Sequence, residues 1–115
     1  MQIKLLKSKI HRAIVTDANV DYIGSISIDY ALMQAANLYE YEKVHVLNLT
    51  TGIRVETYVI KSPENSMEIC INGAAAHLIN KNDMVIIISY CQLEIKEAKQ
   101  HIPYIVHVNK NNQII

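Results

Sequence analysis

The chain has 115 residues, of which 50% are apolar, and its eleven basic and eleven acidic side chains cancel. This length indicates one domain whose core is stable without disulfides or metals. Zero net charge without a long run of one sign argues against nucleic acid as a partner, because phosphate binding needs a basic surface. We find no signal peptide and no long apolar segment, so we expect a cytoplasmic protein with no membrane contact.

Apolar residues alternate with polar ones over most of the chain, and the β-branched residue isoleucine is abundant. The stretch 84–90 is almost wholly apolar, which predicts a central strand buried on both faces. The pattern therefore favours a mainly-β fold, a compact barrel or sandwich. Strands are predicted, in chain order, over residues 1–11, 13–16, 22–28, 42–50, 53–59, 67–72, 84–90 and 104–108.

Shorter features separate these strands. Asp29 is a candidate N-cap of a helix that runs to about Asn37, and residues 93–99 fit either a helix or an edge strand. The tail from Asn109 is predicted to be frayed. The other predicted features are turns at 17–19 and 80–83, a hairpin turn at Thr51-Gly52, a loop at 62–65 and a short helical piece at 74–79.

The candidate metal ligands are two cysteines and five histidines. Cys70 and Cys91 lie in apolar stretches typical of strands, and the histidines show no ligand spacing. We therefore expect both thiols to be reduced core residues, and we expect no metal site.

The dipeptide Gly24-Ser25 is the first candidate for chemistry, since the chain contains only three glycines. A serine hydroxyl can attack the carbonyl of the preceding residue where the backbone bends, and glycine there removes the Cβ clash that resists bending. Taken alone, the dipeptide also fits an ordinary turn, because a chain of this length holds about half a Gly-Ser pair by chance. The interpretation therefore depends on the neighbouring motifs.

Four separated motifs keep a fixed order along about the first 90 residues. They are Lys7–Arg12 (KSKIHR), Asp17–Ser25 (DANVDYIGS), Arg54–Tyr58 (RVETY) and Ile71–His77 (INGAAAH), followed by Asn82–Ile88 (NDMVIII). In order and spacing they resemble the pyruvoyl-dependent aspartate 1-decarboxylases, which make β-alanine for pantothenate synthesis. One difference is Leu47, where some relatives carry tryptophan.

The resemblance implies a double-psi β-barrel with two or three short helices, a homotetramer, and one decarboxylase domain that cuts itself into residues 1–24 and 25–115. In that reaction the Ser25 hydroxyl attacks the Gly24 carbonyl, and the peptide becomes an ester. Elimination then gives dehydroalanine, which hydrolyses to a pyruvoyl group at residue 25. The resemblance implies that this ketone forms a Schiff base with L-aspartate and withdraws electrons as CO₂ leaves.

The resemblance also implies roles for four polar residues. Arg54, which would otherwise be read as a solvated surface residue, binds a substrate carboxylate through its bidentate guanidinium. Tyr58 is the catalytic acid that reprotonates the substrate carbon beside catalytic Ser25. Lys9 is a second cation of the substrate site, and His11 is its hydrogen-bonding neighbour.

The remaining implied site residues are Thr57 and the stretch from Asn72 to Ala75. Thr57 assists processing and contacts substrate, but adjacent strand residues point to opposite faces, so Thr57 and Tyr58 predict a site at a subunit interface. Asn72, Gly73, Ala74 and Ala75 form a strand-to-helix break whose small side chains let backbone N–H groups approach an anionic substrate.

Two alternatives remain open on the sequence. One is a β-barrel interaction module that kept the motifs by descent and has no catalytic activity. The other is a pyruvoyl-dependent decarboxylase of a different amino acid.

Overall fold

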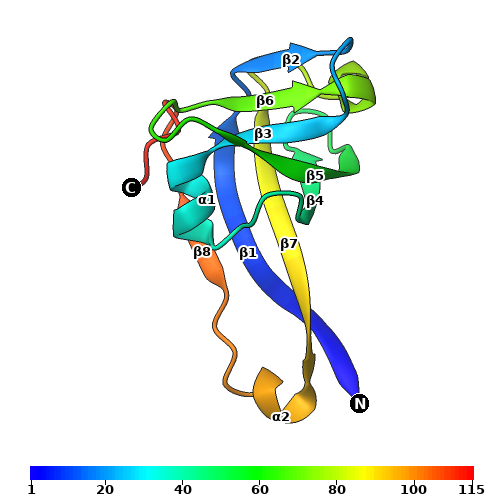
Figure 1. Cartoon of the computed structure of the whole chain (residues 1–115), viewed down its shortest axis with the longest axis vertical. Coiled ribbons are helices and arrows are strands. Elements are labelled where there is room, and N and C mark those ends of the chain that lie inside the picture. Colours follow the sequence, from blue (N-terminus) through cyan, green and yellow to red (C-terminus); the bar gives the residue numbers. More distant parts are fainter.

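Strands dominate the computed structural model of the chain, which describes residues 1–115 (Figure 1). The predicted mainly-β fold with a few short helices is confirmed. The elements are β1 (Gln2–Ile14), β2 (Asp17–Asn19), β3 (Ser25–Asp29), α1 (Tyr30–Ala36), β4 (Lys43–Asn48), β5 (Arg54–Ser62), β6 (Ile69–Asn72), the 3₁₀ helix η1 (Gly73–His77), β7 (Met84–Glu94), α2 (Ile95–Ala98) and β8 (Tyr104–His107).

The eight strands form one ladder in the order β2-β6-β3-β5-β4-β7-β1-β8. Three neighbouring pairs, β2 with β6, β3 with β5, and β1 with β8, are parallel, and the other pairs are antiparallel. The longest pair, β1 with β7, extends as an arm from the body towards the N-terminus and α2 (Figure 1). This mixed ladder is in keeping with the double-psi barrel that the resemblance implies.

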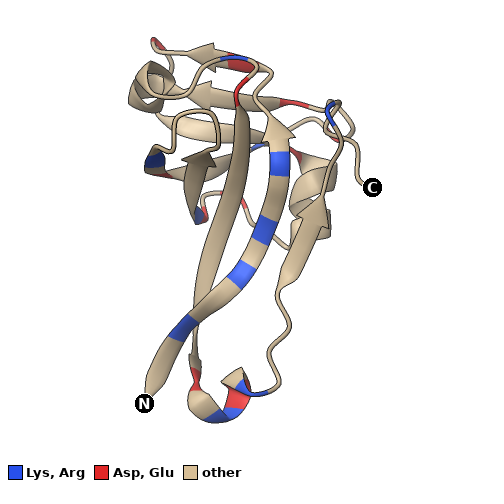
Figure 2. Ribbon diagram, turned by 180° about the vertical axis from the view of Figure 1, so that it is seen from behind, with Lys and Arg blue, Asp and Glu red and all other residues tan.

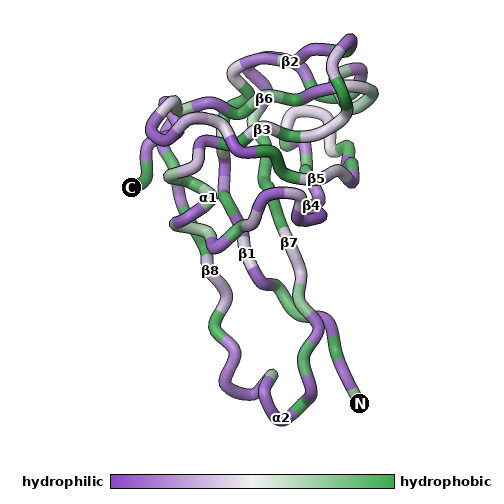
Figure 3. Tube along the Cα trace, in the orientation of Figure 1, coloured by the Kyte–Doolittle hydropathy of each residue, from purple (hydrophilic) through white to green (hydrophobic).

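One face of the curved sheet, which we call the inner face, carries the core. Figure 3 shows hydrophobic residues recurring along the strands of the body. Twenty buried residues form the core, and fully buried Ile10, Val46 and Ile87 lie side by side in register on β1, β4 and β7. The prediction of a central strand at 84–90 is confirmed, because β7 lies between β4 and β1. Continuous burial of both faces covers only residues 85–87, and Tyr90 is 44% exposed.

Helix α1 begins and ends as its sequence predicts. The carboxylate of Asp29 caps it by accepting the Ala31 N–H at 2.8 Å. Asn37 ends it in the left-handed conformation, with φ of 55°, which asparagine tolerates well. The buried Asp29 carboxylate also accepts the backbone N–H groups of Asn65 and Met67, so it ties the loop before β6 to the helix.

Two predictions near the cleavage motif are wrong. Residues 17–19 form no turn: they form strand β2, which pairs in parallel with β6. Asp and Asn favour turns locally, but the partner strand lies about fifty residues further along the chain and is invisible to a local pattern. The second wrong prediction is the strand over 22–28. The strand β3 begins only at Ser25, and residues 20–24 form an exposed loop.

The C-terminal tail is not frayed, contrary to the prediction. Asn112 is 2% exposed and bonds to both backbone groups of Ile14 and to the carbonyl of Met67. Val108 also forms a β-bridge with Ile114. A buried amide with three partners fixes this segment, although its composition resembles that of a flexible end.

Basic residues follow one another along β1, whereas acidic residues are scattered (Figure 2). Lys7 is neutralised by Glu42 at 3.1 Å and also donates to the Asn37 carbonyl. Lys9 takes part in none of the ion pairs of the chain, so its charge is free to meet an anion. None of the helices has the length and apolarity that crossing a bilayer would require.

Candidate active site

Ser25 lies fully buried at the start of β3, where β3 pairs with the end of β6. The side-chain nitrogen Nδ2 of Asn72 donates to Ser25 Oγ at 2.9 Å. The Ser25 hydroxyl itself donates to the carbonyl oxygen of Ile23 at 3.3 Å. These two bonds fix the hydroxyl beside the Gly24–Ser25 peptide, which is the bond that the sequence predicts to be cut.

Gly73 packs directly against Gly24. A Cβ atom on Gly73 would lie 2.5 Å from the Cα of Gly24 and 2.8 Å from its nitrogen, and Gly73 has a φ of +75°. Both the space and the backbone conformation therefore require glycine at position 73. Gly24 itself is not crowded, because the nearest atom to a Cβ built there is the Asn72 carbonyl oxygen at 4.0 Å.

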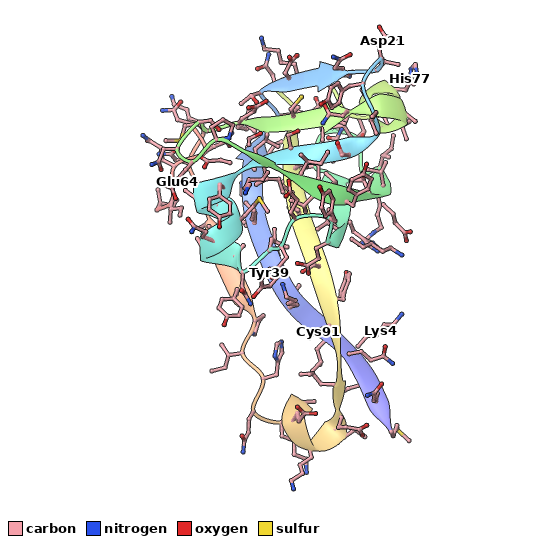
Figure 4. The ribbon with its side chains drawn as sticks, in the orientation of Figure 1. Lys4, Asp21, Tyr39, Glu64, His77 and Cys91 are labelled. Atoms are coloured by element: carbon pink, nitrogen blue, oxygen red, sulfur yellow. The ribbon has the colours of Figure 1, made fainter.

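This contact brings the loop before β3 and helix η1 to one corner of the body. Figure 4 shows Asp21, from the loop, and His77, from the end of η1, at that same corner. Ala74 is exposed and Ala75 is half-buried in the first turn of η1. Asn72 and Gly73 therefore lie at the predicted cleavage bond, and Ala74 and Ala75 follow them in η1.

If the chain is cut at Gly24–Ser25, as the sequence resemblance implies, Gly73→Ala should impair this cleavage severely. The added Cβ must displace the Gly24 backbone and also adopt a positive φ, so the Gly24–Ser25 bond moves relative to Asn72. Intact-mass spectrometry should show predominantly uncut chain. Gly52→Ala is the matched control, because Gly52 also has a positive φ, of 81°, but open space around it. Normal cleavage of Gly73→Ala would contradict the assigned contact.

Tyr58 shares a face of the sheet with Ser25. Strand β3 runs parallel to β5 and pairs Ile26 with Val59. The residues one step before this pair, Ser25 and Tyr58, therefore lie next to each other on the face opposite the core, the outer face. Thr57 is half-buried on the inner face, paired with Val44, so the structure does not place the two neighbours together.

Arg54 lies on the same outer face of β5, exposed, about 13 Å along the strand from Tyr58. Its Nη1 lies 3.1 Å from Nδ1 of His45 on β4, and Nε2 of His45 lies 3.4 Å from Oε1 of Glu56. Because a guanidinium can only donate, Nδ1 accepts and the imidazole proton is on Nε2, towards Glu56. His45 thus orients the arginine.

Lys9 and His11 lie elsewhere in the ladder. Lys9 pairs with Ile88 on β7, Ile88 pairs with His45 on β4, and β5 follows. Three strand spacings, about 14 Å along the sheet, therefore separate Lys9 from the strand that carries Arg54. Within one chain the structure does not bring Lys9 and His11 to Arg54 and Tyr58.

His11 occupies the bulge of β1 and contacts His107 of β8. The two rings lie edge to face with their centroids 5.4 Å apart. Burial lowers the pKa of His11, and the positive charges of Lys9, His107 and Arg12 lower it further. His11 is therefore neutral at pH 7, and its buried Nδ1 has no hydrogen-bond partner within the chain.

A cavity of about 230 Å³ lies beside β1, β4 and β7 on the arm side of the sheet. Figure 4 shows Lys4 and Cys91, two of its lining residues, on the arm. The other lining residues are Lys43, His45, Tyr90 and Gln92. None of the predicted site residues lines it, so the cavity and the cluster around Ser25 are separate features.

Three residues next to the predicted site were not predicted from the sequence: Ser27, Cys70 and His45. Ser27 and Cys70 both lie within hydrogen-bonding distance of the Asn72 amide. The alternation of β3 and β6 puts each on the same face as Ser25 or Asn72, which was the available signal. Counting residues along both strands from the predicted hairpin turn at Thr51-Gly52 places His45 near Arg54, and this was the signal for His45.

Both cysteines are free as expected, but Cys91 is only half-buried.

Comparison with solved structures finds a computationally designed protein, msDPBB_sym2, at a TM-score of 0.47 and 12% identity, covering 76% of this chain and 99% of that chain.

Comparison with curated sequences finds proteins named aspartate 1-decarboxylase. The protein from Caldicellulosiruptor saccharolyticus is 56% identical over 115 residues, which cover 100% of this chain and 90% of the relative. That from Clostridium botulinum (strain Loch Maree) is 56% identical, covering 97% and 89%. That from Campylobacter fetus is 54% identical, covering 99% and 98%. The sequence model described as aspartate decarboxylase matches residues 1–115. The chain is therefore an enzyme of the aspartate decarboxylase family.

Proposed function

We propose that the chain cuts itself between Gly24 and Ser25 and then converts L-aspartate to β-alanine and CO₂. Its membership of the aspartate decarboxylase family supports the reaction. The observation that carries the self-cleavage is the buried Ser25 hydroxyl, held by Asn72 beside the bond to be cut. The whole chain forms one decarboxylase domain, which consists of the fragments 1–24 and 25–115 after cleavage. A cytoplasmic role in supplying β-alanine for pantothenate synthesis stays a prediction.

Cleavage starts with Ser25 Oγ, which forms a bond to the Gly24 carbonyl carbon. The C–N bond breaks, the hydroxyl proton passes to the nitrogen, and the Ser25 amine is released. The resulting ester loses the Ser25 Cα proton, and the Cβ–Oγ bond breaks, so Gly24 leaves as a carboxylate. Hydrolysis of the dehydroalanine then releases ammonia and leaves a ketone at residue 25. The Asn72 amide stabilises negative charge that develops on Oγ, and Gly73 leaves room for the Gly24 backbone to rearrange.

The residues around position 25 fit a pyruvoyl group. Gly73 lies against Gly24 of the cleavage bond, and the Asn72 amide already contacts the side chain of the residue that becomes the ketone. When formed, the pyruvoyl group supplies the electron sink that decarboxylation needs. Arg54 then binds a carboxylate of aspartate, and half-buried Tyr58 donates a proton from its hydroxyl to the substrate carbon that has lost CO₂.

Position-labelled aspartate tests this reaction. Purified protein given L-aspartate labelled at C1 should release labelled CO₂ and form unlabelled β-alanine, whereas substrate labelled at C4 should give labelled β-alanine. Release of CO₂ from C4 would contradict the proposed chemistry. Absence of any cleavage or turnover would favour the interaction module, and faster turnover of another amino acid would favour the second alternative.

We further propose that the active site forms between subunits of a homotetramer. Lys9 and His11 lie too far along the sheet from Arg54 and Tyr58 to share one site within a chain, but a neighbouring copy can supply them. The arm of β1 and β7 and exposed apolar residues of the C-terminal segment offer surface for such contacts. These residues are Ile102, Tyr104 and Ile105, at 81%, 49% and 49% exposure.

Light scattering after size-exclusion chromatography should therefore report a mass four times that of the chain, which is 13.1 kDa before cleavage. Mixing Lys9→Ala protein with Arg54→Ala protein, both of which should have low activity, followed by subunit exchange, should restore part of the activity if the site is shared. A fully active monomer at working concentration would contradict the proposal.

A further inference from the structure

The amide of Asn72 lies at the centre of a buried network that joins β3 to β6. Its Nδ2 donates to Ser25 Oγ at 2.9 Å and to Ser27 Oγ at 3.0 Å. Its Oδ1 accepts from the thiol Sγ of Cys70 at 3.2 Å. The antiparallel register places Ser25 opposite Asn72 and Ser27 opposite Cys70, so all four side chains share the outer face.

The network has one donor that faces the amide oxygen. Both hydrogens of Nδ2 are used by the two serines, and the Cys70 thiol is the only donor within the chain to Oδ1. An amide can rotate by 180° and exchange its oxygen and nitrogen with little change in shape. A thiol that donates to one side therefore favours the orientation in which the nitrogen faces Ser25.

The surroundings of Cys70 keep its thiol protonated. The side chain is buried, at 8% exposure for the residue. Burial raises the pKa of this thiol, and the negative charges of Asp17 and Glu68 raise it further. The thiol therefore remains a hydrogen donor at physiological pH, and it is poorly suited to act as a nucleophile.

We propose that Cys70 is a positioning residue for self-cleavage, whose thiol holds the Asn72 amide with its N–H groups towards Ser25. This inference rests on the proposed function. An N–H donor at Ser25 Oγ stabilises the negative charge that Oγ takes up when the Cβ–Oγ bond of the ester breaks and separates the two fragments, whereas a carbonyl oxygen in its place opposes that charge. Loss of the thiol should therefore slow cleavage without removing the nucleophile.

The test compares Cys70→Val, which keeps an apolar side chain of similar size, with Cys70→Ser, which keeps a donor. The rate at which residues 25–115 appear is followed by intact-mass spectrometry from freshly purified precursor. We expect Cys70→Val to cleave about tenfold more slowly and Cys70→Ser to recover most of the wild-type rate. Cys91→Ala is the control, because this thiol lies in the arm, away from the network, and it should cleave at the wild-type rate.

A double-mutant cycle separates positioning from general destabilisation. If Cys70 acts through the amide, Cys70→Val should cause no further slowing in an Asn72→Ala background. Additive slowing, or equal rates for Cys70→Val and wild type, would overturn the inference. Should the valine variant not fold, Cys70→Ala serves in the same cycle. Absence of cleavage in the wild-type chain would instead contradict the proposed function, so the two failures are distinguishable.

Discussion

Ser25→Ala is expected to remain a single chain of residues 1–115, with no activity on L-aspartate. Alanine offers no oxygen to attack the Gly24 carbonyl, so neither the ester nor the pyruvoyl group can form. The fold should survive, because the Asn72 amide keeps its bonds to Ser27 and Cys70. Intact-mass spectrometry after prolonged warm incubation gives the readout.

The matched control is Ser27→Ala, which removes a hydroxyl from the same strand and from the same amide partner. This variant should still be cut, since its nucleophile is intact. Cleavage of Ser25→Ala at the Gly24–Ser25 bond would disprove the proposed mechanism.

Arg54→Ala is expected to cut itself normally and yet lose most of its activity on L-aspartate. A charge-assisted, bidentate contact to a carboxylate contributes about 2–4 kcal/mol to transition-state binding, so kcat/KM should fall by about 30-fold to 1000-fold. Processing should not change, because Arg54 is the exposed first residue of β5 and lies four residues along the strand from Tyr58, which is the residue next to Ser25.

Steady-state kinetics on fully cleaved protein measure this effect. Lys81→Ala, which removes an exposed positive charge from the turn before β7, is the control for a general change in charge. Arg54→Lys should recover only part of the activity, because a lysine cannot form the bidentate contact. Unchanged kcat/KM in Arg54→Ala would remove this residue from the substrate site.

Much of the fold was predictable because local patterns agree with it. Alternating apolar residues marked most strands, and Asp29 and Asn37 marked the ends of α1. The errors arise where a distant partner decides the conformation. Residues 17–19 become a strand because β6 pairs with them. Asn112 is ordered because the Ile14 N–H donates to its side chain and the carbonyls of Ile14 and Met67 accept from it.

The candidate site was predictable as a set of residues but not as an arrangement. The family motifs named Ser25 and Asn72, but no periodicity shows that Asn72, 47 positions away, bonds to the serine hydroxyl. The clash that a side chain on Gly73 would make with Gly24 depends equally on three-dimensional contact. The side-chain contact of Arg54 with His45 differs, since the β4–β5 hairpin brings these diagonal neighbours together over a short loop.

Intact-mass spectrometry of the wild-type protein tests the central claim most directly. After incubation, self-cleavage should give two fragments, residues 1–24 with a free carboxylate and residues 25–115 lighter by the mass of ammonia than the same fragment beginning with serine. A hydrazide reagent should add to the larger fragment alone, because only a ketone at residue 25 reacts with it. A single uncut mass, or a larger fragment that begins with serine and resists the hydrazide, would contradict the account.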